Sequence, residues 1–351
     1  MSGRVLSRAL LASVMLAMLS ACGTLYVAQA ARGQWQVMHA REPIDKVVAD
    51  RRTPDDLRAH LNEVRDARNF ASRELALPDN GSYRTYADVK RAFVVWNVVA
   101  APEFSVHPQR WCFPIAGCVA YRGYFSETRA RKFGDALRAK GFDVAVGGVP
   151  AYSTLGRFAD PVLSTMLGYG DSELSAIIFH ELSHQLVYAA GDSEFNEAFA
   201  VTVEQAGLER WLTLRGREDD LKRYKLRRQR QQQFVALFTQ TRSRLAELYG
   251  QKLPVETMRE RKKAVFTTLE NEIGDLETQL GTRTGYREWI AEGLNNAHLA
   301  SVATYYDCLP GFERLLSAQG GDLSQFYGAV RRLAKLPRAE RHAQLCRGAT
   351  H

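Results

Sequence analysis

The feature that most constrains this chain is a ten-residue segment, 177–186, with the sequence Ile-Ile-Phe-His-Glu-Leu-Ser-His-Gln-Leu. Its only acidic or basic residue besides the histidines is Glu181, so the segment is typical of a buried helix. On an α-helix, residues four apart lie on one face. His180 and His184 therefore direct two imidazoles at one point, and Glu181 is rotated from them by about 100°.

A His-Glu-x-x-His helix in an apolar setting is typical of zinc enzymes. The histidines supply two ligands, and the glutamate reaches a water on the open side of the metal, where it acts as a general base. Asp171 or Ser172 can cap the start of the helix. The alternative is a core helix with two hydrogen-bonded histidines, which the charge-free flanks disfavour. We expect Zn²⁺ as the cofactor, with His180 and His184 as ligands and Glu181 as the base.

A catalytic zinc needs a third protein ligand and one open position. The next predicted helix, 193–214, places Glu197 and Glu204 on one otherwise apolar face. A carboxylate is costly there unless it is paired or bound to a cation. Glu194 lies at the polar start of the same helix and is the weaker candidate. The residues alone leave open which of Glu197 and Glu204 binds the metal.

The first 22 residues indicate where the chain is located. Two arginines precede an apolar run, 9–19, that is too short to span a bilayer. The run ends in Leu-Ser-Ala-Cys-Gly at 19–23, which resembles the bacterial lipobox. The resemblance implies that 1–21 is a lipoprotein signal peptide and that Cys22 is lipidated and anchors the chain in a membrane. No Asp follows Cys22, which in lipoproteins points to the outer membrane, facing the periplasm. An ordinary secretory signal is the alternative.

Four cysteines remain after Cys22, an even number that suggests disulfides in an oxidising compartment. Cys112 and Cys118 flank a segment with a proline and a glycine that can turn the chain back, so we expect them to pair. A bridge between Cys308 and Cys346 is the weaker expectation.

The charge balance excludes one class of partner. The chain has 47 Lys and Arg against 39 Asp and Glu, a net charge of +8. The basic run 222–230 has no glycine and a single aromatic residue, Tyr224, which indicates a solvated helical face. We therefore expect no nucleic-acid binding.

Hydrophobic periodicity predicts a mostly helical chain with few strands. We expect helices over 44–77, 126–140, 172–190 and 193–214, buried strands at 92–100, 119–125 and 142–149, and an exposed strand at 151–158. The charged stretch 215–285 has leucines at helical spacing, and Pro254 divides it into two long helices. The remainder, 286–351, is again mostly helical.

Several motifs together resemble a bacterial family of predicted zinc-dependent aminopeptidases. They are the lipobox, Trp-Cys-Phe-Pro at 111–114, Tyr-Ser-Thr-Leu-Gly at 152–156, the His-Glu-x-x-His and the Asn196-Glu197 pair. The segment 196–204 also resembles the second motif of the gluzincin metallopeptidases, at a shorter spacing from the histidines. That resemblance implies that Glu197 is the third zinc ligand, with Glu204 and Asn196 outside the coordination shell. Glu204 as the ligand stays open.

Substrate recognition is less clear from the motifs. Gluzincin aminopeptidases hold the substrate amine with a Gly-x-Met-Glu-Asn motif, and the corresponding segment here, 147–154, has no glutamate. The nearest other acids are Asp160, Asp171, Asp192 and Glu194. The exposed strand, with Ser153, Thr154, Leu155 and Gly156, can pair with a peptide backbone.

Amide hydrolysis also needs a group that stabilises the oxyanion. Tyr305 and His298 are seven residues apart on one predicted helix and are the candidates.

We expect one α+β domain over 22–351, mostly helical and zincin-like, with a small sheet and a long helical hairpin inserted at 215–285. The expected activity is hydrolysis of peptides in the periplasm, as an aminopeptidase. A zinc endopeptidase is one alternative. The other is a non-catalytic envelope lipoprotein that binds peptides or cell-wall fragments with a structural zinc. A scaffold role for 215–285 is compatible with either.

Overall fold

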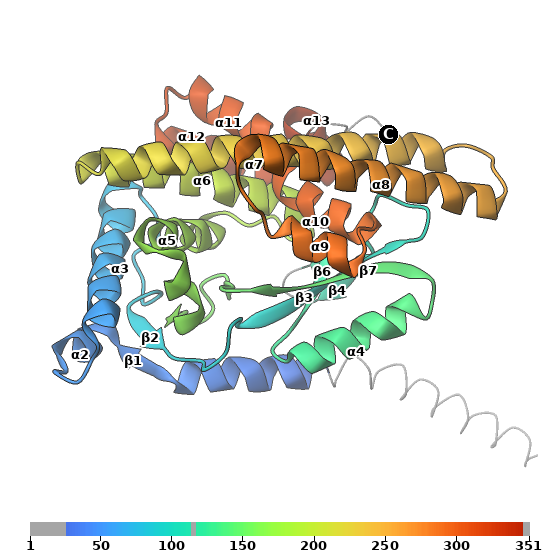
Figure 1. The fold of residues 1–351 in the computed structure, drawn as a ribbon. Coiled ribbons are helices and arrows are strands. Elements are labelled where there is room, and N and C mark those ends of the chain that lie inside the picture. Colours follow the sequence, from blue (N-terminus) through green and yellow to red (C-terminus); the bar gives the residue numbers. More distant parts are fainter. Residues whose placement is uncertain (1–25, 114–116, 347–351) are drawn as a thin grey trace, which may run out of the picture.

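The structure, a computed structural model, describes residues 26–113 and 117–346 (Figure 1). The predicted signal peptide, 1–21, and the predicted lipidation site, Cys22, lie outside these residues. No helix in the described part of the chain is long and apolar enough to cross a membrane. The chain is mostly helical with small sheets, as the sequence predicts.

A helix over 26–39 comes first. The elements that follow it are β1 (Arg41–Pro43), α2 (Ile44–Ala49), α3 (Asp55–Glu74), β2 (Thr85–Ala87), β3 (Val95–Pro102), β4 (Trp111–Phe113), β5 (Gly117–Val119), β6 (Tyr121–Tyr124), α4 (Glu127–Arg138), β7 (Phe142–Val149) and β8 (Val162–Leu163). After a 3₁₀ turn, Ser164–Tyr169, the rest is helical: α5 (Asp171–Leu186), α6 (Ser193–Leu214), α7 (Glu218–Tyr249), α8 (Val255–Leu280), α9 (Tyr286–Glu292), α10 (Asn296–Tyr306), α11 (Leu309–Ala318), α12 (Leu323–Ala334) and α13 (Arg338–Leu345).

The strands form three small sheets. The longest, in the order β6-β3-β7, is antiparallel and pairs Trp96 with Tyr124 on one side and with Gly148 on the other. A second sheet has the order β1-β2-β8, and β4 pairs with β5 as a hairpin. Helix α4 packs on β3 and β7, and α10 packs on the same two strands (Figure 1). The sheet is thereby fixed to the helical part of the molecule.

Helices α5 and α6 lie at the centre of the main core. Helix α5 packs between α3 and α6, and Phe179 on α5 is fully buried. Gly207 lets α6 approach its neighbours closely, because an added Cβ would lie 2.7 Å from a methyl of Leu75 and 3.0 Å from the ring of Phe179. Burying so much apolar surface around two adjoining helices stabilises their relative position.

Two long helices, α7 and α8, form the hairpin predicted over 215–285 (Figure 1). Pro254 separates them, as expected. Their contact has its own core, in which Phe238, Leu245, Leu269 and Ile273 are buried. The basic run 222–230 belongs to the first turns of α7, and most of its side chains are exposed or half-buried. The hairpin packs against α6 and α10, so it also covers the central helices.

Two predicted elements differ from the structure. The segment 151–158 is a loop with turns and not a strand. Its Thr154 donates hydrogen bonds from the backbone N–H and the hydroxyl to the carboxylate of buried Asp160, at 2.9 and 2.8 Å. Leu155 has a positive φ of 57°, which no strand residue adopts. The predicted helix 172–190 ends earlier, at Leu186, because Val187 is extended.

Candidate metal centre

Helix α5 presents its histidines in the way that the sequence predicts. His180 and His184 are one turn apart, and the centroids of their rings lie 5.0 Å from each other. The rest of the helix is held by burial of Leu174, Ile178 and Leu182. The helix therefore has little freedom to rotate, and its position fixes the direction of both rings.

A short turn brings α6 back beside the histidines. Gly191 has a φ of 80°, a conformation that favours glycine. The Asn196 side chain accepts a 2.7 Å hydrogen bond from the Ala189 N–H and donates one of 2.9 Å to the Ala189 carbonyl. Asp192 caps α6 by accepting a bond from the Phe195 N–H. These contacts fix the start of α6 and hence the position of Glu197, one residue after Asn196.

Three donor atoms converge between the two helices. Oε2 of Glu197 lies 3.3 Å from Nε2 of His180 and 3.8 Å from Nε2 of His184. The ligand atoms of the three residues all lie within 4.8 Å of one another. In a tetrahedral zinc site with bonds of about 2.1 Å, the ligand atoms are roughly 3.4 Å apart. Two imidazoles and a carboxylate at these separations fit a divalent metal.

The protonation of two of these groups fits a metal directly. The pKa of His180 is raised well above its usual value, because its hydrogen bonds to Glu197 and Glu204 outweigh the effect of burial, so a metal would displace its proton. Burial lowers the pKa of His184 to about 4, so this imidazole is neutral near pH 7. Its Nδ1 is buried and has no hydrogen-bond partner. Burial raises the pKa of Glu197, but His180 and His184 lower it by more. The pKa is therefore below its usual value, and the carboxylate is ionised. A neutral imidazole and an ionised carboxylate are the forms that bind metals.

Glu204 reaches the outer side of His180. Its Oε2 lies 3.0 Å from Nδ1 of His180, on the opposite side of the ring from Glu197. A carboxylate in this place fixes the tautomer and the orientation of the imidazole. The structure thus puts Glu197 among the ligand atoms and Glu204 behind one of them.

Glu181 lines the same cavity as the three donors. Burial, together with the negative charges of Glu197, Asp160 and Glu204, raises its pKa to about 7, and His180 opposes the shift. A carboxylate that exchanges its proton near neutral pH is suited to general acid–base chemistry.

The donors lie in a large cavity of about 1300 Å³. The helix 26–39 forms one wall, and it is held to β6 through Gln29, which accepts from the Phe125 N–H and donates to the Gly123 carbonyl, both at 3.3 Å. Strands β3 and β6 and the loop 150–155 form a second wall, and α5 and α6 form the floor. Ser153, Thr154 and Leu155 line the cavity as a loop, whereas Gly156 does not line it.

Several tyrosines surround the donors. Tyr305 lines the cavity, and the negative charge of Glu197 and then burial raise its pKa well above the usual value. Tyr121 and Tyr188 also line it, and burial and the charge of Glu197 raise the pKa of each. Each phenol is therefore protonated at neutral pH and can donate a hydrogen bond. The sequence did not indicate Tyr121 and Tyr188, because nothing in their local pattern shows that they face the metal donors.

His298 is a correction. It lies in the first turn of α10, is buried beside Trp289 at a ring distance of 5.0 Å, and does not line the cavity. Its Nδ1 accepts a hydrogen bond from the Asn295 N–H, so it caps its own helix. His298 and Tyr305 are seven residues, or two helical turns, apart on α10, but only Tyr305 reaches the cavity.

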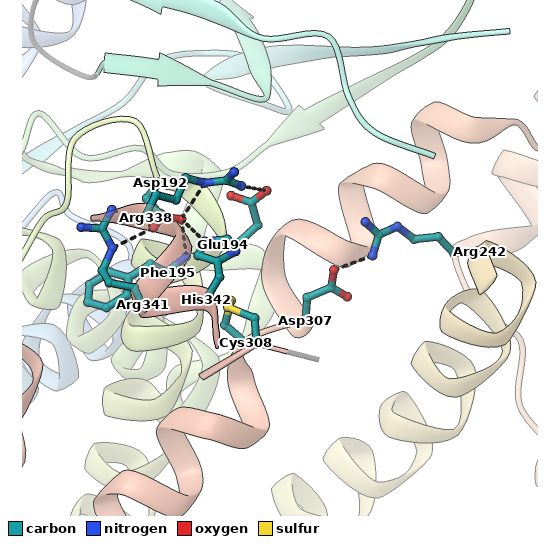
Figure 2. Close-up of a disulfide and its surroundings, with 10 residues drawn as sticks. Asp192, Glu194, Phe195, Arg242, Asp307, Cys308, Arg338, Arg341 and His342 are labelled. Carbon is teal, nitrogen blue, oxygen red and sulfur yellow. Dashed lines mark hydrogen bonds and ion pairs between the residues drawn. A yellow bond between two sulfur atoms is a disulfide. The ribbon is translucent and has the colours of Figure 1, made fainter. Parts of the chain in front are cut away.

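None of the four acids expected near the substrate amine lines the cavity. Asp160 binds Thr154, Asp171 pairs with His60 at 2.6 Å, and Glu194 pairs with Arg338. Asp192 is fully buried and binds Arg341 and His342 on α13 (Figure 2). The sequence missed Glu173, which lines the cavity two turns before His180 and pairs with Arg227.

The structure contains both disulfides that the sequence considered. Cys112 and Cys118 are bonded across the β4–β5 hairpin, where they face each other in register. Cys308 and Cys346 join the start of α11 to the end of α13 (Figure 2). The second bond holds α13 near Asp192 and hence near the cap of α6.

A known protein family matches the chain over most of its length. A family model described as "Putative aminopeptidase" matches residues 25–345. The chain belongs to this family. The match includes the helix 26–39, the helices α5 and α6, and both cysteines of the Cys112–Cys118 disulfide. No curated protein and no solved structure matches the chain.

Proposed function

We propose that this member of the aminopeptidase family is a zinc-dependent peptidase. The observation that carries the proposal is the convergence of His180, His184 and Glu197, with ligand atoms within 4.8 Å of one another, beside the half-buried Glu181. The same two-histidine, one-glutamate set holds the catalytic zinc of well-known peptidases. A purely structural site needs no base, so the presence of Glu181 disfavours a non-catalytic lipoprotein.

A zinc ion bound there supplies a Lewis acid for the scissile carbonyl and for a water molecule. Glu181 would accept a proton from a water molecule whose oxygen attacks the scissile carbonyl carbon. The C–N bond then breaks, and Glu181 returns the proton to the leaving nitrogen. Tyr305, with its protonated phenol near Glu197, donates a hydrogen bond to the oxyanion.

The preference for a free amine needs a carboxylate in the cavity. Four glutamates line it, of which Glu181, Glu197 and Glu204 have the roles given above. Glu173 is the remaining one, and we propose it as the group that binds the substrate ammonium. An endopeptidase, which needs no such group, is the second candidate, because Asp160, Asp171, Asp192 and Glu194 all lie outside the cavity.

We also propose that the chain is anchored through Cys22 and acts in the periplasm. The lipobox at 19–23 supports the anchor, and the two disulfides are typical of an oxidising compartment. Labelled palmitate tests the anchor, since it should be incorporated by the parent chain and not by Cys22→Ser.

Peptide hydrolysis with and without a chelator tests the proposed activity. Loss of hydrolysis on chelation and its return with Zn²⁺ are expected. Hydrolysis that is unaffected by removal of all metal would contradict the proposal.

A further inference from the structure

The cavity is apolar at its mouth. In the described part of the chain, seven large apolar residues are exposed to solvent, with exposed fractions between 46 and 69%. Four of them line this cavity. They are Val27 and Trp35 on the helix 26–39, Phe158 on the loop between β7 and β8, and Tyr169 before α5. Single exposed apolar residues scattered over a surface are ordinary, but a cluster of them at one opening marks a binding surface.

The helix 26–39 turns one face toward this opening. Its residues 26, 27, 30, 31, 34, 35 and 38 all line the cavity, a helical spacing that makes a continuous wall. The wall is attached on both sides of the opening. Gln29 binds the edge of β6, and the Tyr152 hydroxyl donates to the Gln34 side chain. The apolar face of this helix is therefore presented to whatever occupies the cavity.

The charges of the lining have one sign. Among the described residues that line the cavity there is no lysine or arginine, and the acidic groups are four glutamates. Of these glutamates, Glu173 pairs with Arg227, and Glu197 and Glu204 both contact His180. An acidic side chain bound away from the metal donors would therefore meet no lysine or arginine of the lining and would lie near carboxylates of the same sign. A phospholipid head group is disfavoured for the same reason, because phosphate is usually bound by arginine, lysine or helix N-termini.

The size of the cavity exceeds that of a site for a small metabolite. Its volume, about 1300 Å³, is larger than the range of about 300–1000 Å³ that drug-sized ligands fill. The catalytic groups lie on the floor, and the apolar side chains lie above them on several walls. A chain of several residues can thus contact both parts at once.

We propose that the cavity binds peptides that carry large apolar side chains near the scissile bond and discriminates against acidic ones. This inference rests on the proposed function, since it names the substrate class of the same site. Trp35, Phe158, Val27 and Tyr169 supply the apolar contacts, and the glutamates on the floor repel acidic side chains.

Binding to the Glu181→Gln protein tests this inference without hydrolysis. Calorimetry on the full-length chain compares the amidated pentapeptide Ala-Leu-Phe-Leu-Ala with its partner Ala-Glu-Phe-Glu-Ala. The apolar peptide should bind at least about tenfold more tightly. Adding Trp35→Ala or Phe158→Ala should weaken its binding by about fivefold or more, as for other aromatic contacts at interfaces. Leu214→Ala is the matched control, because Leu214 is 69% exposed and does not line the cavity.

Equal affinity for the two peptides would overturn the inference, as would an equal loss in Leu214→Ala and Trp35→Ala. Binding of lysophosphatidylcholine without binding of the apolar peptide would overturn it in favour of a lipid. This test of the substrate class can fail independently of the test of the proposed peptidase activity. Tight apolar binding by a protein whose parent hydrolyses nothing would contradict only the activity, and hydrolysis without preference would contradict only the substrate class.

Discussion

Nδ1 of His180 lies 3.0 Å from Oε2 of Glu204, while Nε2 of the same ring lies 3.3 Å from Oε2 of Glu197. One imidazole therefore stands between two carboxylates that come from one helix, two turns apart. The ring can bind a metal only through the nitrogen that faces Glu197. This relationship favours Glu197 over Glu204 as the ligand, the order that the family resemblance implies and that the residues alone leave open.

Removal of Glu204 is expected to weaken zinc binding without abolishing it. Glu204→Ala should lower the affinity by about 10–100-fold, because the His180 ring loses the partner that fixes its orientation. Glu204→Gln, which keeps a hydrogen-bond acceptor, should lose less. Competition with a chromophoric chelator measures both values. If Glu197→Ala keeps its zinc while Glu204→Ala loses it entirely, the roles of the two carboxylates are reversed.

The contacts of Asp192 predict unequal effects for two arginines of α13. Asp192 is fully buried, and the Arg341 side chain beside it is 8% exposed, whereas that of Arg338 is 43% exposed (Figure 2). Arg341→Ala should lower the free energy of unfolding by about 3 kcal/mol, because the buried carboxylate of Asp192 loses the more buried of its two arginine partners. Arg338→Ala should cost less than about 1 kcal/mol. Urea unfolding checks both, and equal costs would contradict this assignment.

Buried Asp160 gives a prediction for pH. Burial raises its pKa to about 6, although the bonds from Thr154 oppose the shift. The unfolded carboxyl ionises near its ordinary value of about 3.9, so the folded state holds the proton more tightly between these values. The stability contributed by the protonated carboxyl is therefore lost as the pH rises from about 4 to about 6, by up to about 3 kcal/mol.

The comparison with Asp160→Asn isolates this effect. The difference in the free energy of unfolding between the parent chain and the variant should shift in favour of the variant as the pH rises from about 4 to about 6. Urea unfolding at several pH values measures it. A difference that stays constant over this range, or that shifts toward the parent, would show that the pKa of Asp160 is not raised.

Glu173 gives the test of amine binding. Glu173→Gln should lower kcat/KM for peptides with a free amine by about tenfold, since a charge-assisted contact is lost. The value for the same peptides with an acetylated amine should stay unchanged. Asp171→Asn is the control, because Asp171 is on the same turn, pairs with His60 and does not line the cavity. Equal treatment of free and acetylated peptides by the parent chain would favour an endopeptidase.

Much of the fold and the metal donors could be predicted because their signals are local. His180, Glu181 and His184 lie within five residues, and the helical period alone brings the histidines together. Pro254 and the leucine spacing likewise indicated the two long helices. The carboxylate of Glu197 could be expected from its cost on an apolar face, although its ranking against Glu204 needed the position of His180.

The remainder depends on contacts between distant residues. The segment 151–158 is a loop and not the expected strand, because Thr154 bonds to Asp160 and Leu155 has a positive φ of 57°. His298 has the right spacing from Tyr305, yet it is used to cap its own helix. The helix 26–39 is held at the cavity by Gln29, which binds β6, and by Gln34, which accepts from Tyr152. These contacts span 94 and 118 residues, and no local pattern indicates them.

The zinc content and the peptidase activity of Glu181→Gln, measured on the same preparation beside the parent chain, test the mechanism most directly. The carboxylate of Glu181 is placed as the base and not as a ligand. The variant should therefore contain about one zinc per chain, as the parent does, and its kcat should fall by at least about 100-fold. A variant that keeps full activity, or one that loses its zinc together with its activity, would contradict this role.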